Sequence, residues 1–498
     1  MSNDRQKLEL TWIGKNNPEY DIANIEPRIL EERNDLSYGD PDTENIIIHG
    51  DNLLALKALL PEYEGRIKCI YIDPPYNTDN AFENYDDSVE HSTWLSLMKP
   101  RLQILKMLLK EDGSLIIQID DNEYARLYLL LIEIFEEQNL KTICVKMSEA
   151  TGVKMAHVIN KGRIPKLKEY LIVARNDGIK DLFVEKIPKE KWDNEYKHVV
   201  RGVTKGDVNE LKSIIEDDEQ CSLEDIARAD KICSKMHLDS LGSLFSEFNA
   251  GTDEEKQNLK YENAWRIVRD VATSDTAKKE ADTKRKTFAG NFFVVVTPQK
   301  KKYVIKKDYN PSTSQPRIKL LFADDYLTIH PGDFWQDIKT TGLDNEGGVD
   351  FRKGKKPEAL LKRIIGMSSN EGEWVLDSFL GSGTTCAVAQ KMNRKYIGIE
   401  MGDQAYTHCK IRLEKVTDGM DQGGISKAVG WTGGGGFKFY ELAPSFVTID
   451  EFGNPVIDSH YSGTKLIRAS VLLRKYCYFP GPCLASSSRL DWVKKYNS

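Results

Sequence analysis

The chain has 498 residues, of which 40% are hydrophobic and 30% charged, and its formal net charge is −7. This length predicts two to four structural units and the composition is that of a soluble globular protein, whose longest apolar stretches are far too short to span a membrane. The eight scattered cysteines exclude a disulfide scaffold and a zinc site, because no CxxC occurs and no histidine stands at zinc spacing, so we expect reduced thiols, no metal and a cytoplasmic protein.

Strands and helices alternate from Asn45 onwards, after a polar, charge-mixed stretch at residues 1–44 that is expected to be an arm without the apolar core of a signal peptide. The expected strands are Ile46 to Ile48, Ile67 to Ile72 and Ser114 to Ile119, and the expected helices are Leu53 to Leu60 and Trp94 to Lys110. The second helix has apolar residues close to a 3.6 period and is expected to end at Glu111-Asp112-Gly113. This alternation predicts an α/β fold with a mostly parallel sheet and helices on both faces, whose first half covers residues 45–178.

The most specific motif in the chain, Asp73-Pro74-Pro75-Tyr76, directly follows the strand that ends at Ile72. The two prolines fix the backbone and leave the Pro74 carbonyl free to accept a hydrogen bond beside the Asp73 carboxylate. Two adjacent acceptors are what a planar NH₂ group needs to present its nitrogen lone pair, and Tyr76 offers a face on which an extruded base can stack. The plain alternative is a Pro-Pro turn after a strand, which does not account for the flanking Asp and Tyr.

Composition changes after Gly178, which predicts a separate region over residues 179–330. Residues 208–270 are helical in pattern and acid-rich, whereas residues 278–307 contain ten Lys or Arg against two acids. Because neutralised phosphates supply much of the affinity for DNA, the basic run is a candidate DNA track, although a solvated surface loop would have the same charges. The candidate DNA-binding residues are Lys284, Arg285, Lys286, Lys300, Lys301 and Lys302.

The α/β pattern resumes near Phe334 and continues to about Val416, and it contains a glycine loop between a buried strand and a helix. Glycines let a backbone approach a ligand closely, and the acid Glu400 ends the next strand, seventeen residues beyond Gly383, where it suits a ribose diol. The candidate cofactor contacts here are Asp377, Phe379, Gly381, Gly383, Thr384 and Glu400. A strand–turn–helix with a helix cap is the plain alternative, and the missing GxxxxGK[ST] pattern leaves ATP binding unsupported.

A Gly-rich stretch at residues 419–436 and a tail make up the last region, residues 417–498. A flexible linker is one interpretation of the glycines, and the interspersed Ile425, Trp431 and Phe437 argue against it. The tail carries basic residues and a Ser-rich patch at 486–488.

The two turns, in this order, resemble the amino-methylating DNA methyltransferases of the β arrangement, over about residues 45–178 and 331–446. In that family the catalytic half comes first, a target-recognition region follows, and the half that binds the methyl donor comes last. The resemblance implies a Rossmann-like methyltransferase fold with an inserted recognition region at 179–330 and a donor half at 331–416. It also implies contacts of Asp51 with the donor adenine and of Lys356 and Pro357 with the donor carboxylate, and a base pocket walled by Lys168 to Val173.

The glycine-rich segment through Tyr440-Glu441-Leu442 is similar to the modification subunit of type III restriction systems. That resemblance implies methyl transfer from S-adenosylmethionine to adenine N6 in double-stranded DNA, a homodimer, and a separate restriction (helicase–nuclease) subunit as partner, with residues 417–498 as a dimer or partner contact. Three alternatives stay open: cytosine N4 methylation, methylation of RNA or a protein amide, and a DNA-reading specificity subunit with an inactive site. A dehydrogenase is disfavoured, because it leaves Asp73-Pro74-Pro75-Tyr76 unexplained.

Overall fold

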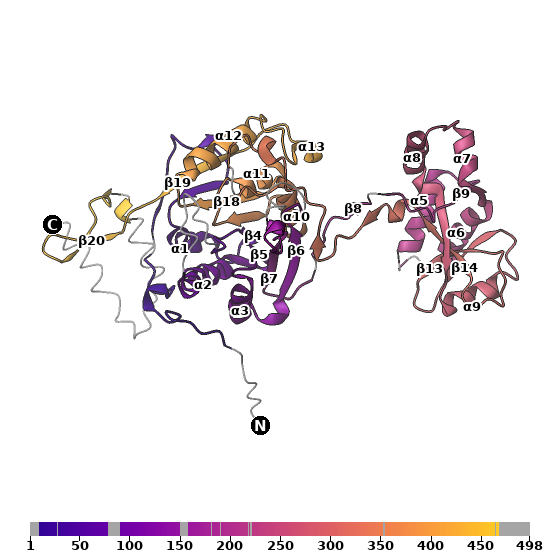
Figure 1. The fold of residues 1–498 in the computed structure, drawn as a ribbon, viewed down its shortest axis with the longest axis horizontal. Coiled ribbons are helices and arrows are strands. Elements are labelled where there is room, and N and C mark those ends of the chain that lie inside the picture. The colour runs from indigo at the N-terminus through magenta and orange to yellow at the C-terminus, as the bar shows by residue number, and fades with distance from the viewer. Residues whose placement is uncertain are drawn as a thin grey trace, which may run out of the picture. The chain divides into compact units, whose positions relative to one another are not determined.

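The structure, a computed structural model, describes residues 9–467 apart from 27, 78–89, 150–157, 181, 190, 218, 220, 221, 352, 353 and 464. The chain divides into two compact units, one made of Met1–Glu185 with Gly332–Ser498 and the other of Lys186–Pro331 (Figure 1). The second unit occupies nearly the same stretch as the expected insert, and its role in target recognition stays a prediction. The tail beyond residue 467, with its Ser-rich patch, lies outside the described residues.

The first unit is built on a sheet that has eleven strands among the described residues, in the order β1-β19-β3-β18-β17-β4-β5-β7-β6-β16, with β2 also paired to β19. These strands are β1 (Leu30–Glu32), β2 (Tyr38–Gly39), β3 (Ile46–His49), β4 (Ile67–Ile72), β5 (Leu109–Ile119), β6 (Leu140–Lys146), β7 (Lys168–Arg175), β16 (Phe334–Trp335), β17 (Trp374–Asp377), β18 (Lys395–Glu400) and β19 (Gly436–Leu442). The strands from β19 to β5 are mutually parallel, and β7 runs antiparallel between β5 and β6. The predicted mostly parallel α/β sheet is therefore confirmed.

Helices cover both faces of this sheet, as expected (Figure 1). They are α1 (Asn52–Tyr63), α2 (His91–Leu108), α3 (Tyr124–Phe135), α10 (Glu358–Ser368), α11 (Thr384–Lys391), α12 (Ile411–Thr417) and α13 (Ser426–Val429). Helices α1 to α3 pack on one face and α10 to α12 on the other, so the sheet separates two hydrophobic clusters. Alternate residues of β4 supply the two clusters: Ile70 and Ile72 enter the first, and Cys69 and Tyr71 enter the second.

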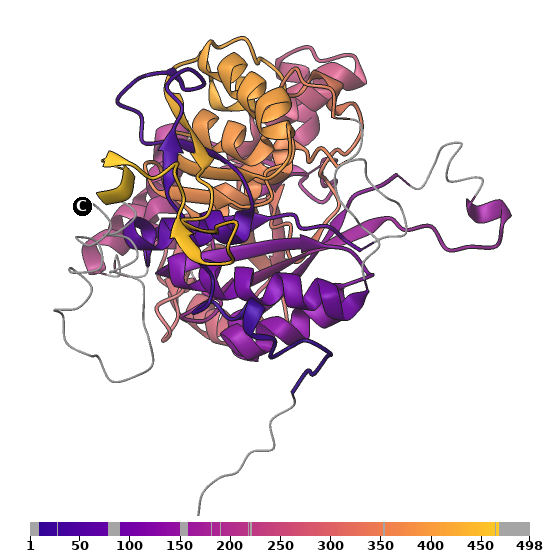
Figure 2. The same ribbon diagram turned by 90° about the vertical axis from the view of Figure 1, so that its left-hand side faces the viewer.

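The N-terminal segment differs from the expected arm, because its described part packs on the first unit. Strands β1 and β2, drawn in indigo in Figure 2, pair with β19, drawn in orange. Trp12 donates its indole N–H to Ser96 Oγ on α2, at 2.9 Å. Strand β19 would otherwise present an unpaired edge. Strands as short as β1 and β2, with three and two residues, leave no period-2 signal in the sequence.

The expected end of the second helix is also corrected. Helix α2 ends at Leu108 and β5 begins at once, so Glu111-Asp112-Gly113 lies inside the strand instead of ending the helix. A Cβ on Gly113 would lie 2.9 Å from the Ile67 carbonyl oxygen, which explains the glycine at this irregular start of the β4–β5 pair.

The Gly-rich segment is folded, so the linker interpretation is wrong for it. Trp431 donates its indole N–H to the Val416 carbonyl at 2.9 Å, and α13 follows the turn at Gly423 and Gly424. The segment leads into β19, which extends the sheet beyond the expected end of the donor half at residue 416. Past the sheet, β20 (Val447–Ile449) and β21 (Pro455–Ile457) form a hairpin. No helix among the described residues is both long and apolar enough to cross a membrane.

The second unit has its own antiparallel sheet, in the order β10-β9-β11-β14-β13-β12. Its strands are β9 (His198–Arg201), β10 (His237–Ser240), β11 (Ile267–Ala272), β12 (Phe292–Val296), β13 (Lys302–Lys306) and β14 (Arg317–Phe322), with a separate pair β8 (Ile187–Pro188) and β15 (Thr328–Ile329). Its helices are α5 (Lys205–Glu216), α6 (Leu223–Lys235), α7 (Leu241–Glu247), α8 (Asp253–Glu262) and α9 (Asp275–Lys284). The basic run of residues 278–307 therefore spans the end of α9 and the hairpin β12–β13.

Candidate active site

The Asp73 turn and the glycine loop emerge side by side from neighbouring strands. Strand β17 pairs with β4 in parallel, with Val375 opposite Cys69 and Leu376 opposite Ile70. Parallel neighbours end at the same edge of a sheet, so the residues that follow β4 and β17 meet at the carboxyl edge, where α/β proteins bind their ligands. The two motifs lie about 300 residues apart in the sequence, and the sheet brings them together.

Four polar side chains meet at the Asp73 turn. The Tyr76 hydroxyl donates to Asp73 Oδ1 at 2.6 Å and lies 2.9 Å from Glu169 Oε2 on β7. The ammonium of Lys356 donates to the Tyr76 oxygen at 2.7 Å and lies 3.2 Å from Asp73 Oδ2 and 3.1 Å from Glu169 Oε2. With both carboxylates ionised and one ammonium, this site has one net negative charge. The single hydroxyl proton of Tyr76 can be donated to only one of the two carboxylates at a time.

The turn is held by its prolines and by its neighbours. Trp94 on α2 donates its indole N–H to the Pro75 carbonyl at 2.8 Å, whereas no hydrogen bond from any described residue reaches the Pro74 carbonyl. On the other side, Gln118 donates to Glu169 Oε2 at 2.5 Å and accepts the Tyr71 hydroxyl proton at 2.6 Å. The Pro74 carbonyl thus keeps its capacity to accept a hydrogen bond, and its pairing with Asp73 as acceptors for an amino group stays a prediction.

The two carboxylates differ in acidity. Burial raises the pKa of Asp73 to about 6, against the opposing effect of the Lys356 ammonium. Burial acts in the same direction on Glu169, but Lys356 and the hydrogen bonds from Gln118 and Tyr76 outweigh it and lower the pKa of Glu169. Burial disfavours the Lys356 ammonium, but both carboxylates compensate and raise the pKa of Lys356. Asp73 is therefore the carboxylate of the pair that takes up a proton more readily.

The glycine loop is a preformed turn between β17 and α11. The buried Asp377 carboxylate accepts the Phe379 N–H at 2.9 Å and the Thr385 hydroxyl at 2.5 Å, and burial raises the pKa of Asp377 to about 7. Gly381 and Gly383 have left-handed φ values of +57° and +80°. A Cβ on Gly383 would lie 3.1 Å from the Cys409 Cα, whereas open space surrounds the Cβ position of Gly381.

Further residues expected to contact a cofactor gather around this loop. The buried Glu400 carboxylate accepts the Gly381 N–H at 2.8 Å and the Gly402 N–H at 3.0 Å. Asp51 caps α1 by accepting two backbone N–H groups, and the adjacent Asn52 donates to the Ser378 carbonyl at 2.8 Å. The structure therefore brings Asp51, Asp377, Phe379, Gly381, Gly383 and Glu400 together.

Lys356 and Thr384 were expected to contact a cofactor, and in the structure both contact other side chains of the protein. The Lys356 ammonium lies on Asp73, Tyr76 and Glu169, so its contact with a donor carboxylate stays a prediction. The Thr384 hydroxyl accepts a hydrogen bond from Arg412 at 2.7 Å, and Pro357 stands at the start of α10.

A buried charge cluster, which we define as Glu358, Lys391, Arg412 and Asp421, lies behind the loop and was not predicted. Lys391 Nζ is 2.9 Å from Glu358 Oε2 and 2.7 Å from Asp421 Oδ2, and Arg412 Nη2 is 2.8 Å from Glu358 Oε1. At most 2% of any of these side chains is exposed. The cluster is neutral overall and joins α10, α11, α12 and the Gly-rich segment.

Gln118 was also missed as a site residue, and Glu169 was expected only within the pocket wall at Lys168 to Val173, without a role of its own. Gln118 is the one polar residue in the run Leu115 to Ile119, and Glu169 comes two residues before the apolar run that starts at Leu171. A polar residue inside a buried strand, near the edge that holds the site, is the signal that could have identified them.

Three of the expected DNA-contact residues, Lys284, Arg285 and Lys302, have identified partners in their own unit. Lys284 forms an ion pair with Asp230 at 2.5 Å, Arg285 lies 4.4 Å from the Tyr309 ring centre, and Lys302 is 3% exposed. Burial of Lys302 contradicts a contact with DNA, because its ammonium donates to the Asp217 carbonyl inside the fold. Lys286, Lys300 and Lys301 have exposed side chains.

Known proteins resemble this chain over most of its length. The model of a family described as DNA methylase matches residues 67–410. The probable type III restriction-modification enzyme HindVI Mod subunit of Haemophilus influenzae is 37% identical over 422 residues, which are 82% of this chain and 55% of that protein. The EcoPI Mod subunit of Escherichia phage P1 is 26% identical over a match that covers 79% of this chain and 62% of that protein. The EcoP15I Mod subunit of Escherichia coli is 23% identical over 97% of this chain and 79% of that protein.

The chain spans about half the length of the HindVI relative. The matched residues include both turns of the site, Asp73 to Tyr76 and the glycine loop that precedes α11. The chain belongs to the N6/N4 DNA methylase family.

Proposed function

We propose that this chain transfers a methyl group from S-adenosylmethionine to N6 of adenine in double-stranded DNA, as the modification subunit of a restriction-modification system. The observation that carries this proposal is the parallel pairing of β4 and β17, which brings the Asp73 turn and the glycine loop to the same edge of the sheet. Family membership is compatible with adenine N6 or cytosine N4, and the Mod-subunit relatives together with Asp73 at the first motif position favour adenine.

The residues around the glycine loop fit a nucleoside donor. Open space lies over Gly381, the Glu400 carboxylate is buried at the end of β18, and the Asp51 side chain, 37% exposed, offers a carboxylate to an adenine amino group. Phe379 supplies a partly buried apolar surface beside them. When bound, S-adenosylmethionine supplies an electrophilic methyl group.

The Asp73 turn would hold the target amine. Asp73 and the Pro74 carbonyl accept its two N–H groups, so the nitrogen lone pair points away from them, and the Tyr76 ring packs on the base. The amino nitrogen would gain the methyl group as its carbon–sulfur bond breaks and the thioether leaves, and the nitrogen would lose one proton to the Asp73 carboxylate. This transfer needs no covalent enzyme intermediate, and positioning and electrostatics would provide the catalysis.

The amine would compete with Lys356 for Asp73, because the Lys356 ammonium already contacts Asp73, Tyr76 and Glu169. Lys356 therefore has two effects in this proposal. Its positive charge keeps Asp73 ionised, and its position must change or be shared when the base enters.

The test is expression of this chain alone in a host that lacks DNA methylation, followed by sequencing that detects modified bases. We expect N6-methyladenine at one recurring sequence, and none in cells that express Asp73→Ala. N4-methylcytosine at such a sequence would refute the adenine assignment. Absence of any modified base, with no S-adenosylmethionine binding in calorimetry, would instead indicate a DNA-reading subunit.

Target reading is assigned to the second unit, with phosphate contacts from the exposed Lys286, Lys300 and Lys301. Duplex DNA, a second copy of the chain and a restriction subunit are the proposed partners. Light scattering of the purified chain with and without its target duplex tests the dimer and the DNA complex.

The pH dependence of methyl transfer tests the role of Asp73. Because burial raises the pKa of Asp73 to about 6, the ionised form is lost as the pH falls through that value. We expect kcat/KM for DNA to fall about tenfold for each pH unit below about 6. In Lys356→Met the midpoint should move to higher pH, because the charge that stabilises the Asp73 carboxylate is gone, whereas Lys356→Arg should keep it. An unchanged midpoint in Lys356→Met would show that Lys356 does not act on Asp73.

Gly381→Ala is expected to weaken S-adenosylmethionine binding by about tenfold, because a methyl group would enter the open space over the loop. Its left-handed φ should also cost about 1 kcal/mol of folding stability. Gly372→Ala is the matched control. Gly372 also has a left-handed φ, +76°, and open space around its Cβ position, but it precedes β17 and so lies at the edge of the sheet away from the site. Calorimetry should give a wild-type Kd for Gly372→Ala, and equal losses in both variants would mean that strain alone weakens binding.

A further inference from the structure

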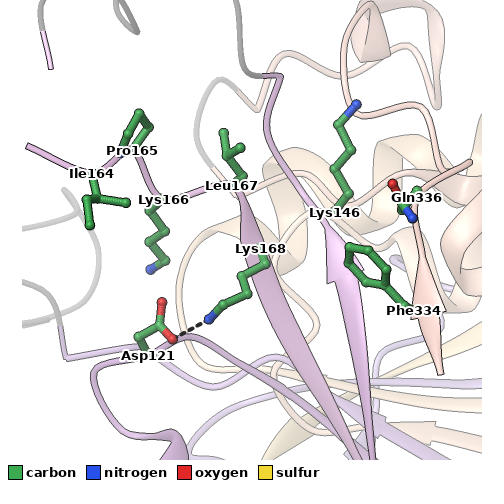
Figure 3. A pocket seen from close by; sticks show the side chains of 9 residues that line it. All are labelled: Asp121, Lys146, Ile164, Pro165, Lys166, Leu167, Lys168, Phe334 and Gln336. Atoms are coloured by element: carbon green, nitrogen blue, oxygen red, sulfur yellow. Dashed lines mark hydrogen bonds and ion pairs between the residues drawn. The ribbon is translucent and has the colours of Figure 1, made fainter. Parts of the chain in front are cut away.

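A cavity of about 510 Å³ opens at the carboxyl edge of the sheet, beside the Asp73 turn. Its walls are Asp121 after β5, Lys146 at the end of β6, the segment Ile164 to Lys168, and Phe334 and Gln336 from β16 and its continuation. Figure 3 shows Phe334 and Gln336 on one side of the cavity and Ile164 to Lys168 on the other. The proposed mechanism uses none of these residues.

The strand order places this cavity on the substrate side of the catalytic turn. Strand β4, which carries Asp73, lies between β17 with the glycine loop and the group β5, β7, β6 and β16 with the cavity. A methyl donor held by the glycine loop therefore lies on one side of Asp73, and the cavity lies on the other. Lys166 connects the cavity to the turn, with its ammonium 5.9 Å from the centre of the Tyr76 ring.

The lining combines cations with an exposed aromatic ring. Three lysines, Lys146, Lys166 and Lys168, line the cavity, and Phe334 is 51% exposed, although Trp335 beside it is fully buried. Ammonium groups bind phosphates, and an accessible aromatic face stacks with a base of any sequence. Gln336 adds an amide that can donate to or accept from a base edge.

Each of these lysines has a carboxylate partner: Lys146 contacts Glu149 at 2.8 Å, Lys168 contacts Asp121 at 2.5 Å, and Lys166 contacts Asp120. The carboxylates Glu149 and Asp121 are 46% and 51% exposed, and ion pairs at such positions contribute little free energy. A phosphate can therefore replace or share the partners of Lys146 and Lys168. Asp120 is fully buried, so Lys166 keeps its ion pair and a phosphate shares its ammonium with Asp120.

We propose that this cavity binds the nucleotide that adjoins the flipped target base in the same strand, with its phosphate on the lysines and its base against Phe334. The inference rests on the proposed function. The cavity is not assigned to the target base itself, because Asp73, Tyr76 and Glu169 do not line it. Its volume accommodates one nucleotide unit, and its connection through Lys166 places that unit next to the base at Asp73.

The first experiment measures DNA binding without methyl transfer. Fluorescence anisotropy with a labelled single-stranded oligonucleotide of mixed sequence compares wild type, Phe334→Ala and Phe452→Ala, a control whose ring is 80% exposed in the β20–β21 turn. We expect the Kd to rise about tenfold for Phe334→Ala and to stay unchanged for Phe452→Ala. Lys146→Ala should lower the slope of log Kd against log salt by about 0.7, the value for one phosphate contact on a single strand, whereas Lys141→Ala, at the other end of β6, should not. Wild-type affinity in both Phe334→Ala and Lys146→Ala overturns the proposal.

The second experiment locates the contact within a target duplex, with the position taken from the modified-base sequencing. Duplexes that lack the base on one side of the target, or on the other, are compared with the intact duplex for wild type and Phe334→Ala. We expect the Phe334→Ala loss to vanish on one of the two abasic duplexes. A loss of the same size on all three duplexes overturns the assignment. If wild type modifies no DNA, the proposed function fails, and the oligonucleotide experiment still decides whether the cavity binds a nucleotide.

Discussion

Asp73→Ala is expected to lower the rate of methyl transfer by about a thousandfold and to leave S-adenosylmethionine binding unchanged. The substitution removes one of the two acceptors that hold the amino group, and it removes the group placed to take its proton. The remaining Glu169 cannot substitute, because it reaches the turn only through Tyr76 and Lys356. Transfer of labelled methyl groups to target DNA and calorimetry with the donor measure the two effects separately.

Two further variants sharpen this experiment. Asp73→Asn keeps the shape and one acceptor oxygen but cannot take a proton, so its rate should lie near that of Asp73→Ala. Asp112→Ala is the control. Asp112 lies on the same sheet near the start of β5, away from the carboxyl edge that holds the site, and its side chain is 48% exposed. If Asp73→Asn transferred methyl groups at the wild-type rate, Asp73 would act as an acceptor alone and the proton would leave by another route.

Glu358→Ala is expected to destabilise the first unit by about 3 to 5 kcal/mol. The substitution leaves the buried Lys391 and Arg412 with a single carboxylate, Asp421, and Arg412 does not contact Asp421 among the interactions described. A buried charge without a partner has a far larger free-energy cost than the loss of an exposed ion pair. The midpoint of urea unfolding, followed by tryptophan fluorescence, measures the change.

Lys362→Ala on the same helix is the matched control, because its ion pair with Glu185 is on the surface. We expect it to change the free energy of unfolding by less than about 1 kcal/mol. Equal losses in Glu358→Ala and Lys362→Ala would mean that the buried charge cluster is not what holds α10 against α11 and α12. Glu358→Ala should also loosen the glycine loop, since Arg412 contacts Thr384 as well.

Features coded by local pattern were predictable from the sequence. The strand before Asp73, the helix after Asp51, and the strand–loop–helix around Gly381 each have a short apolar run with a turn signal, and each appears in the structure. The adjacency of the two turns followed only from family resemblance, because nothing in either segment states which strands pair. Strand pairing depends on contacts between residues hundreds of positions apart, which local periodicity cannot report.

The site residues that were missed or differently placed share this cause. Lys356 was assigned together with Pro357 by family resemblance, yet its ammonium lies on Asp73, which follows β4, and on Glu169 of β7. Glu358, Lys391 and Arg412 were given no role from the sequence, although they belong to one buried charge cluster. Side-chain direction at such positions is decided by which elements pack against each other, and the sequence does not contain that information in local form.

The position of β3 has a consequence for synthesis. Ile46 pairs with Ile397 on β18 and with Lys438 on β19, so both neighbours of this strand emerge from the ribosome about 350 to 390 residues later. At translation rates of about 5 to 20 residues per second, the wait is on the order of 20 to 80 seconds. During that time the apolar strand Ile46 to Ile48 has two unpaired edges and can join another nascent chain. The yield of folded protein should therefore depend on translation speed and on chaperones that cover this strand until β18 and β19 have been made.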